Sequence, residues 1–223
     1  MPARSSVFNA RYSGFLFDMD GTLINSIAAA ERIWSAWANA HGLDVETFLP
    51  TIHGARAIDT IARLGLPGID PEVEACAITE AEIFDLAGIV EVSGAAAFLK
   101  TLPANKWAIV TSAPKELAIR RLQAAGIPLP LVFVTSEDVS DGKPNPDCYL
   151  LAAQQLGINA ADCLVFEDAP IGIRAGEASG AQVMVVSATH VHPMQTPHAS
   201  IDDYCGTVVR VDEQGYLHLC EVL

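Results

Sequence analysis

Two aspartates, Asp18 and Asp20, are the residues most able to do chemistry, in the segment Phe17-Asp18-Met19-Asp20-Gly21-Thr22-Leu23. They directly follow an apolar run that is typical of a buried strand. Two carboxylates so close together repel each other, so a concave site that holds both needs a cation between them. Mg²⁺ meets that need, because it takes one or two carboxylates together with phosphate oxygens of a substrate. Taken alone, the segment also fits an Asp-Gly turn that caps a helix.

Polar residues also stand at the ends of the later strand-like runs. Thr111-Ser112 offers hydroxyls and backbone N–H groups at the start of a helix, where the helix dipole favours an anion. Lys143 is a cation between a glycine and a proline, and Glu167-Asp168 adds two carboxylates. In isolation Ser112 and Asp168 fit helix caps, and Lys143 fits a solvated loop charge. Their occurrence in order at successive strand ends favours one shared site for a cation and an anion.

The elements that must position these residues alternate between strand and helix. Helices are predicted between the strands, and those at 115–125 and 171–179 are each opened by a proline and closed by a glycine. The alternation predicts an α/β fold with a doubly wound, mainly parallel, Rossmann-like sheet, and ligands bind such sheets at the carboxyl ends of the strands. Five continuous apolar runs are predicted as strands buried on both faces: 14–17, 108–110, 131–134, 164–166 and 183–186.

One region breaks the alternation, because residues 27–90 contain no buried-strand run. Apolar residues recur there at helical spacing from Ile27 to His41, and further helices are expected at 55–64 and 72–86. This all-helical insert leaves the core after the first strand and returns before the second, so it is expected to lie over the strand ends as a cap. We predict a core domain of residues 1–26 and 91–223 and an inserted cap domain of residues 27–90.

The end of the chain departs from both patterns. Residues 188–203 are rich in His and Pro and are expected to form a loop. Residues 207–211 and 216–219 are predicted to form a small hairpin at the edge of the sheet.

Together the motifs resemble those of the haloacid dehalogenase superfamily, and within it the phosphatases that carry a helical cap inserted after the first motif. The resemblance covers the chain up to about Ala188. The matching segments are Asp18-Met19-Asp20-Gly21-Thr22, Thr111-Ser112, Gly142-Lys143-Pro144-Asn145-Pro146 and Glu167-Asp168-Ala169-Pro170-Ile171-Gly172.

This resemblance implies that Asp18 is the nucleophile that takes the phosphoryl group. It implies that Asp20 protonates the leaving alcohol and then activates water. Asp18, the main-chain carbonyl of Asp20, and Asp168 would hold Mg²⁺, with Glu167 either a ligand or a neighbour of the ligands. Dehalogenases of the superfamily lack the second aspartate, so Asp20 favours phosphoryl transfer.

Thr111, Ser112 and Lys143 are implied to hold the phosphate oxygens. A carboxylate that attacks a phosphate monoester meets like-charge repulsion of about 4 kcal/mol per charge pair, at ~4 Å and an effective dielectric constant of ~20. Mg²⁺ and Lys143 would offset that repulsion and stabilise the transition state. An aspartyl-phosphate intermediate splits one difficult displacement into two easier ones.

Substrate choice is expected to lie in the cap. His53-Gly54-Ala55-Arg56 resembles the His-Gly-x-Arg stretch of sugar and polyol phosphatases in the superfamily. His53 and Arg56 are expected either to hydrogen-bond substrate hydroxyls or to help close the cap. The other explanation is a loop histidine and a solvated helix arginine. Trp34 and Trp37 are expected in the core of the cap.

The leading prediction is a Mg²⁺-dependent phosphatase acting on small sugar or polyol phosphates. A phosphohexomutase with the same core chemistry is the first alternative, but mutase relatives carry a hinge histidine where this chain has Ile27-Ala28-Ala29-Ala30. A non-catalytic regulator on the same fold is the second alternative. That reading would need missing motif residues, and none is missing.

Composition argues against several other classes. Thirteen Lys and Arg against 27 Asp and Glu give a formal net charge of −14, which argues against a nucleic-acid partner. No apolar stretch approaches the roughly 18 residues of a spanning helix, and residues 1–13 do not resemble a secretory signal. A cytoplasmic location without a membrane partner is therefore expected. Five scattered cysteines without a CxxC pair argue against disulfides and a thiolate zinc site. The expected partner is a small-molecule phosphate monoester, and a monomer is compatible with the sequence.

Overall fold

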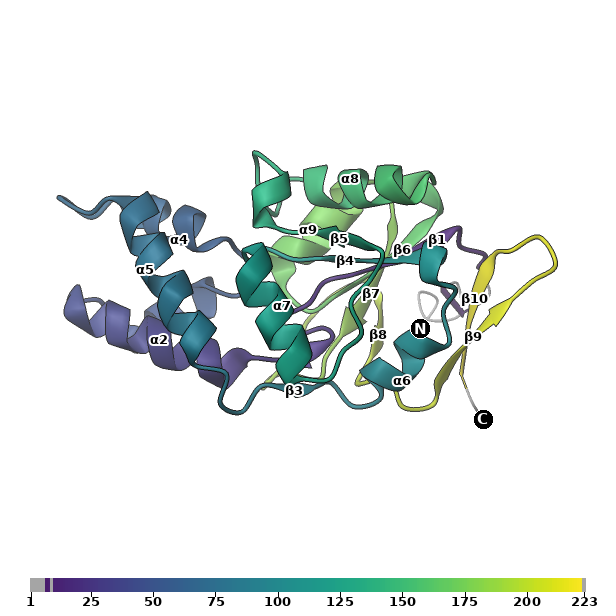
Figure 1. Cartoon of the computed structure of the whole chain (residues 1–223), viewed down its shortest axis with the longest axis horizontal. Helices are drawn as coiled ribbons and strands as arrows, with labels where there is room; N and C mark the ends of the chain where they lie inside the picture. Colours follow the sequence, from purple (N-terminus) through teal and green to yellow (C-terminus); the bar gives the residue numbers. More distant parts are fainter. Residues whose placement is uncertain (1–6, 9, 222–223) are drawn as a thin grey trace.

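A parallel sheet of six strands forms the centre of the part of the chain that the computed structural model describes, residues 7, 8 and 10–221 (Figure 1). Residues 1–6 and 9 lie outside the described residues. They belong to the segment 1–13 that was predicted not to be a secretory signal. From edge to edge the strands are β5 (Val132–Val134), β4 (Trp107–Val110), β1 (Gly14–Phe17), β6 (Cys163–Glu167), β7 (Gln182–Val186) and β8 (Ala199–Ile201).

Helices cover both faces of this sheet, because side chains alternate between the faces along each strand. Phe15 and Phe17 of β1 point to one face, which α6 (Ala95–Lys100) and α7 (Lys115–Ala124) cover. Leu16 points to the other face, which α8 (Asp147–Leu156) and α9 (Pro170–Ala178) cover. The predicted doubly wound α/β fold is confirmed. Short 3₁₀ turns complete the connections: η2 (Ala104–Lys106), η3 (Ser136–Asp138) and η4 (Ala160–Asp162).

The five predicted strands are confirmed, but the predicted loop at 188–203 is wrong at its end. Ala199–Ile201 forms β8 and pairs in parallel with Met184–Val186 of β7. Its side chains alternate buried, exposed and buried, and a run of three residues is too short for that pattern to stand out in the sequence.

The predicted hairpin is confirmed as a hairpin but not in its position. Strands β9 (Thr207–Val211) and β10 (Leu217–Glu221) pair antiparallel as a separate two-stranded sheet. The backbone of Tyr12, just before β1, pairs with Leu217, and the buried side chains of Leu217 and Leu219 join the main core. The hairpin therefore closes one end of the molecule instead of extending the edge of the central sheet (Figure 1).

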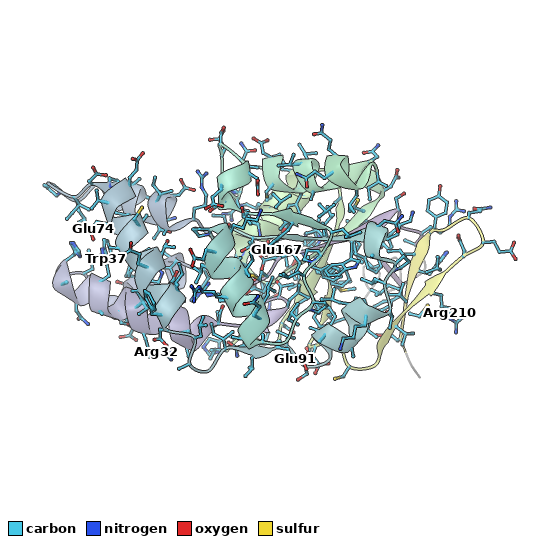
Figure 2. All side chains as sticks on the ribbon, in the orientation of Figure 1. Arg32, Trp37, Glu74, Glu91, Glu167 and Arg210 are labelled. Atoms are coloured by element: carbon cyan, nitrogen blue, oxygen red, sulfur yellow. The ribbon has the colours of Figure 1, made fainter. Side chains whose placement is uncertain are left out.

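Helices from the region between β1 and β4 form the opposite end of the molecule (Figure 1). They are α2 (Ile27–Ala40), α3 (Val45–Phe48), η1 (Leu49–Thr51), α4 (Ala57–Leu64) and α5 (Pro71–Phe84). Trp34, Trp37 and Phe48 are buried together in an apolar cluster of this helical region, as expected for the tryptophans. Figure 2 shows Trp37 pointing toward Glu74 of α5, and its indole N–H donates to that carboxylate over 2.8 Å.

Two crossings join this helical region to the sheet region. Strand β2 (Ile24–Asn25) leads from the sheet into the helical region, and strand β3 (Val90–Glu91) leads back to the sheet. The two strands pair antiparallel over two residues each, which is too short to predict from sequence. The division into domains 1–26 with 91–223 and 27–90 stays a prediction, although both crossings lie near its limits. Within the described ranges, no helix has the length and apolar character needed to cross a membrane.

Phe17 is expected to be one of the largest single contributors to stability. Its ring stacks on Phe166 at 4.6 Å between centroids and contacts Phe98 and Trp107 edge-on. Phe17→Ala should lower the free energy of unfolding by about 3–5 kcal/mol, measured by urea denaturation. Phe84→Ala is the matched control, because Phe84 is 84% exposed and its removal should change that free energy by no more than about 0.5 kcal/mol. Similar losses for both variants would contradict this assignment.

Candidate active site

The carboxyl ends of three adjacent strands bring the predicted site residues together. Asp18 follows β1, Thr111 follows β4, and Glu167 ends β6, with β1 lying between the other two. Asp168 comes next after Glu167, and Lys143 enters from the loop between β5 and α8. Parallel pairing places all these ends at one edge, so residues far apart in sequence share one site.

A buried ion network holds the centre of this site. The Lys143 ammonium donates to Asp18 Oδ1 over 2.6 Å, to Glu167 Oε1 over 2.7 Å and to the Val110 carbonyl over 3.3 Å. Burial alone lowers the pKa of Lys143, but the charges of Asp18 and Glu167 outweigh it, so the pKa is raised. Lys143 therefore stays a cation in the interior.

Asp18, Glu167 and Asp168 form an acidic triad whose ligand atoms all lie within 4.8 Å of one another. Burial raises the pKa of Asp18 to about 7, helped by the Glu167 charge and opposed by Lys143. Burial also raises the pKa of Asp168 well above its usual range, and Asp18 and Glu167 add to it. One oxygen, Asp18 Oδ2, is buried without a hydrogen-bond partner among the described residues.

These features fit a hard divalent cation. The donors are all oxygens, and three carboxylates against one ammonium leave two negative charges when every group is ionised. The orphaned Asp18 Oδ2 is a free ligand atom inside the triad. Asp18 and Asp168 are the residues best placed to hold the ion.

Glu167 is held from several sides by the protein itself. Its Oε1 accepts from the Tyr149 hydroxyl over 2.7 Å as well as from Lys143, and its Oε2 accepts from the amides of Asp168 and Ala169. Figure 2 shows it in the interior of the sheet region. Because protein donors occupy both oxygens, Glu167 is suited to orient Lys143 beside a cation.

Glycines leave the room that these carboxylates need. A Cβ on Gly172 of α9 would lie 1.8 Å from Glu167 Oε1, and one on Gly21 would lie 2.0 Å from Asp168 Oδ2. Gly21 also has a positive φ of 89°, which residues with a side chain rarely adopt. The site therefore requires both glycines, and the turn at Gly21 requires its glycine as well.

Asp20 lies beside the triad and has partners of its own. Its Oδ1 accepts a short hydrogen bond from the Ser26 hydroxyl and another, 2.9 Å long, from Arg121 of α7. Arg121 was missed by sequence reasoning, although Leu117, Ala118, Arg121 and Leu122 are the buried residues of α7. A charged residue within a buried helical stripe is the signal that could have identified it.

The remaining core candidates border a cleft between the sheet ends and the cap helices. Asp18, Asp20, Thr111 and Ser112 line it, and the cleft opens to solvent. The Thr111 side chain is buried and accepts from the Ala113 amide, and the Ser112 hydroxyl donates to the carbonyl of Gly54 over 2.8 Å. Ser112 therefore joins the strand ends to the cap.

The structure separates the two cap candidates. His53 lines the cleft, with its Nε2 3.4 Å from Glu31 Oε1. Arg56 lies instead beside a neighbouring hollow with Gly142 and Lys143, where it pairs with Asp59 and donates to the Ser140 carbonyl over 2.9 Å. Through the Ser140 carbonyl, Arg56 connects the cap to the core. Its prediction and that of His53 as substrate-binding residues stay untested.

Comparisons with known proteins show which family and which relatives this chain is similar to. The family described as "haloacid dehalogenase-like hydrolase" matches residues 12–180. Hexitol phosphatase A of Escherichia coli is 45% identical over 193 residues, which is 84% of this chain and 87% of that protein. Glycerol-1-phosphate phosphohydrolase 1 of Saccharomyces cerevisiae is 34% identical over 202 residues, 85% of this chain and 80% of that protein. The crystal structure of a hydrolase from Pseudomonas syringae covers 81% of this chain and 87% of its own, with a TM-score of 0.71 and 27% identity.

Gly172→Ala should disturb the site through Glu167. The new methyl group displaces the Glu167 carboxylate from Lys143 and Tyr149, so the free energy of unfolding in excess chelator should fall by about 3 kcal/mol. Gly176→Ala is the matched control on the same helix, because its Cβ would crowd Val183 at 3.0 Å and Val165 at 3.1 Å but would contact no residue of the site. Both changes carry the same gain in helix propensity. Equal unfolding free energies for the two variants, from urea denaturation, would refute the role given to Gly172.

Proposed function

This chain belongs to the haloacid dehalogenase-like hydrolases, and we propose that it hydrolyses phosphate monoesters of small sugars or polyols. The observation that carries the proposal is the Asp18 carboxylate, anchored by Lys143 through Oδ1 while Oδ2 stays free of hydrogen bonds from described residues, at the base of a cleft. A carboxylate held in one orientation by a lysine at the base of a cleft is suited to attack a phosphorus atom. The similarity to a hexitol phosphatase and a glycerol-1-phosphate phosphohydrolase supports the substrate class.

In the proposed first step, an Asp18 oxygen forms a bond to phosphorus while the bond from phosphorus to the sugar oxygen breaks. Asp20 donates its proton to that oxygen, so a neutral alcohol leaves and an aspartyl phosphate remains. In the second step Asp20 takes a proton from water, which attacks the phosphorus and releases inorganic phosphate and free Asp18. The hydrogen bonds from Ser26 and Arg121 to Oδ1 of Asp20 orient its carboxyl group for both transfers.

Lys143, Thr111 and Ser112 are proposed to bind the phosphate oxygens. Lys143 carries a fixed charge beside Asp18, and Thr111 and Ser112 lie at the end of β4 in the wall of the cleft. Mg²⁺ is proposed as the cofactor, held by Asp18, Asp168 and the main-chain carbonyl of Asp20. When bound, it supplies positive charge that offsets the repulsion between the nucleophile and the phosphoryl oxygens.

Hydrolysis is favoured over the two alternatives. The first turn of α2, at Ile27-Ala28-Ala29-Ala30, has no histidine of the kind that mutase relatives carry at the hinge. A non-catalytic regulator would have no need of a buried lysine and a convergent acidic triad, since such groups are costly to bury. A cytoplasmic location and the oligomeric state stay predictions.

The decisive experiment is a phosphate-release screen with Mg²⁺ over hexitol, glycerol, aldose, ketose and nucleotide monophosphates. Sugar or polyol phosphates should be the best substrates. Asp18→Asn keeps the shape of the nucleophile but removes its charge, so turnover should disappear while the fold persists. Asp162→Asn, at an exposed aspartate outside the site, should keep full activity. Release of phosphate from no compound of the panel, or an active Asp18→Asn variant, would overturn the proposal.

Activity should require Mg²⁺ and should be lost in excess chelator. Because burial raises the pKa of Asp18 to about 7, protons compete with the metal for this carboxylate. The folded pKa lies above the ordinary value, so Asp18 gains a proton as the pH falls below about 7, and metal affinity falls with it. The half-saturating Mg²⁺ concentration should rise, approaching about tenfold per pH unit below that point. Measured at about pH 6, 7 and 8, an unchanged half-saturating concentration would contradict this assignment, as would full activity in chelator.

A further inference from the structure

Two charged residues outside the motifs meet across the boundary between cap and core. Glu82 lies on α5 and Arg121 on α7, and Arg121 Nη2 is 3.1 Å from Glu82 Oε1. The side chains are only 10% and 6% exposed. Both residues line the same cleft as Asp18 and Asp20.

Stability does not account for this pair. Removing two charges from water costs about as much as their attraction returns, and well-packed apolar residues between two helices are often as stable or more stable. In addition, Arg121 Nε is buried without a hydrogen-bond partner among the described residues. An unsatisfied buried donor on a cleft-lining residue indicates that something else completes the site.

The charges around the pair define what that group can be. Arg121 is already paired with both Asp20 and Glu82, so its charge is not free to balance a further carboxylate. His53, which also lines the cleft, faces the Glu31 carboxylate at 3.4 Å. A leaving group with its own carboxylate would lie beside the Glu82 carboxylate without a free cation of this pair to balance it, which costs binding energy in a partly buried cleft.

Neutral hydroxyl groups suit the same wall. A hydroxyl both donates and accepts, so adjacent hydroxyls can donate to Glu82 and accept from Arg121. The apolar side chains of Trp34 and Ile52 line the same cleft and can cover the C–H surface of the carbon chain. An acceptor, a donor and an apolar wall together match a polyhydroxylated chain without charge of its own.

We propose that Glu82 and Arg121 determine substrate specificity by binding adjacent hydroxyls of a neutral polyol or sugar and by rejecting leaving groups that carry a carboxylate. This inference rests on the proposed phosphatase function and extends it to the leaving group. Arg121 also contacts Asp20, so the pair joins recognition of the hydroxyls to the residue that protonates the leaving oxygen. Glu82 comes from the cap, so this recognition requires the cap to lie over the core.

The competing explanation is a latch that only holds the cap to the core. A latch would affect every substrate equally, whereas a specificity pair affects only those with hydroxyls or a carboxylate at the right place. Three phosphates distinguish the two: a hexitol 6-phosphate, the hexonate 6-phosphate that differs by a terminal carboxylate, and an aryl phosphate without hydroxyls.

Glu82→Gln is the principal variant, because it keeps the shape and removes the charge. It should lower kcat/KM for the hexitol phosphate about tenfold and that for the aryl phosphate less than about twofold. The preference for hexitol over hexonate phosphate should fall by about tenfold or more. Glu82→Asp keeps the charge but withdraws the carboxylate, so hexitol phosphate activity should fall while discrimination against the hexonate persists. Glu80→Gln, at an exposed glutamate on the same helix, is the matched control and should change none of these values.

Each outcome has a separate meaning. Equal losses on all three substrates would overturn the proposal in favour of a latch, and no loss on any would remove Glu82 from the site. A wild-type enzyme that hydrolyses hexitol and hexonate phosphates equally well would also overturn it. Failure of the proposed function looks different, because wild-type protein with Mg²⁺ would then release phosphate from none of the three. Circular dichroism and thermal unfolding of each variant identify any loss that comes from misfolding.

Discussion

The contact between the Lys143 ammonium and the carboxylates of Asp18 and Glu167 is the interaction on which the rest of the site depends. All three groups are almost fully buried, where an uncompensated charge would be very costly. One ammonium cannot balance three carboxylates, so Asp168 and the free oxygen of Asp18 remain as a site of negative charge. This imbalance favours the binding of a divalent cation at the triad.

Much of the surrounding fold can be understood from the needs of that contact. β1 lies at the centre of the sheet with β4 and β6 on either side, so Asp18 leaves its strand with a strand end on each flank. α8 supplies the Tyr149 hydroxyl to Glu167, and Gly172 lets α9 approach that carboxylate closely. The sheet provides apolar packing on both faces, and the polar groups are confined to the edge where its strands end.

The parts predicted from sequence are those in which a local pattern decides the structure. Buried strands appear as apolar runs, and Asp18, Glu167 and Lys143 could be identified because each stands at the end of a run or in a constrained turn. Strand β8 was not predicted, because a run of three residues carries little periodicity. The hairpin was predicted at the wrong place, because its position depends on backbone pairing with Tyr12. Arg121 was not predicted as a site residue, because its contact with Glu82 depends on the packing of α7 against α5.

Three polar contacts cross from the cap to the core at the cleft and beside it. Ser112 reaches the Gly54 carbonyl, Arg56 reaches the Ser140 carbonyl, and Arg121 reaches Glu82. The buried aromatic residues of the cap, by contrast, form a cluster of their own around Trp34 and Trp37. Polar contacts at a rim exchange with water at small net cost, whereas separating an apolar core is expensive. Because such contacts can exchange with water, we expect the cap to be able to move at the cleft, and the contact of Arg121 with Glu82 requires α5 to lie against α7. Substitutions on the cap side of the cleft can thus change which substrate binds without changing the groups near Lys143.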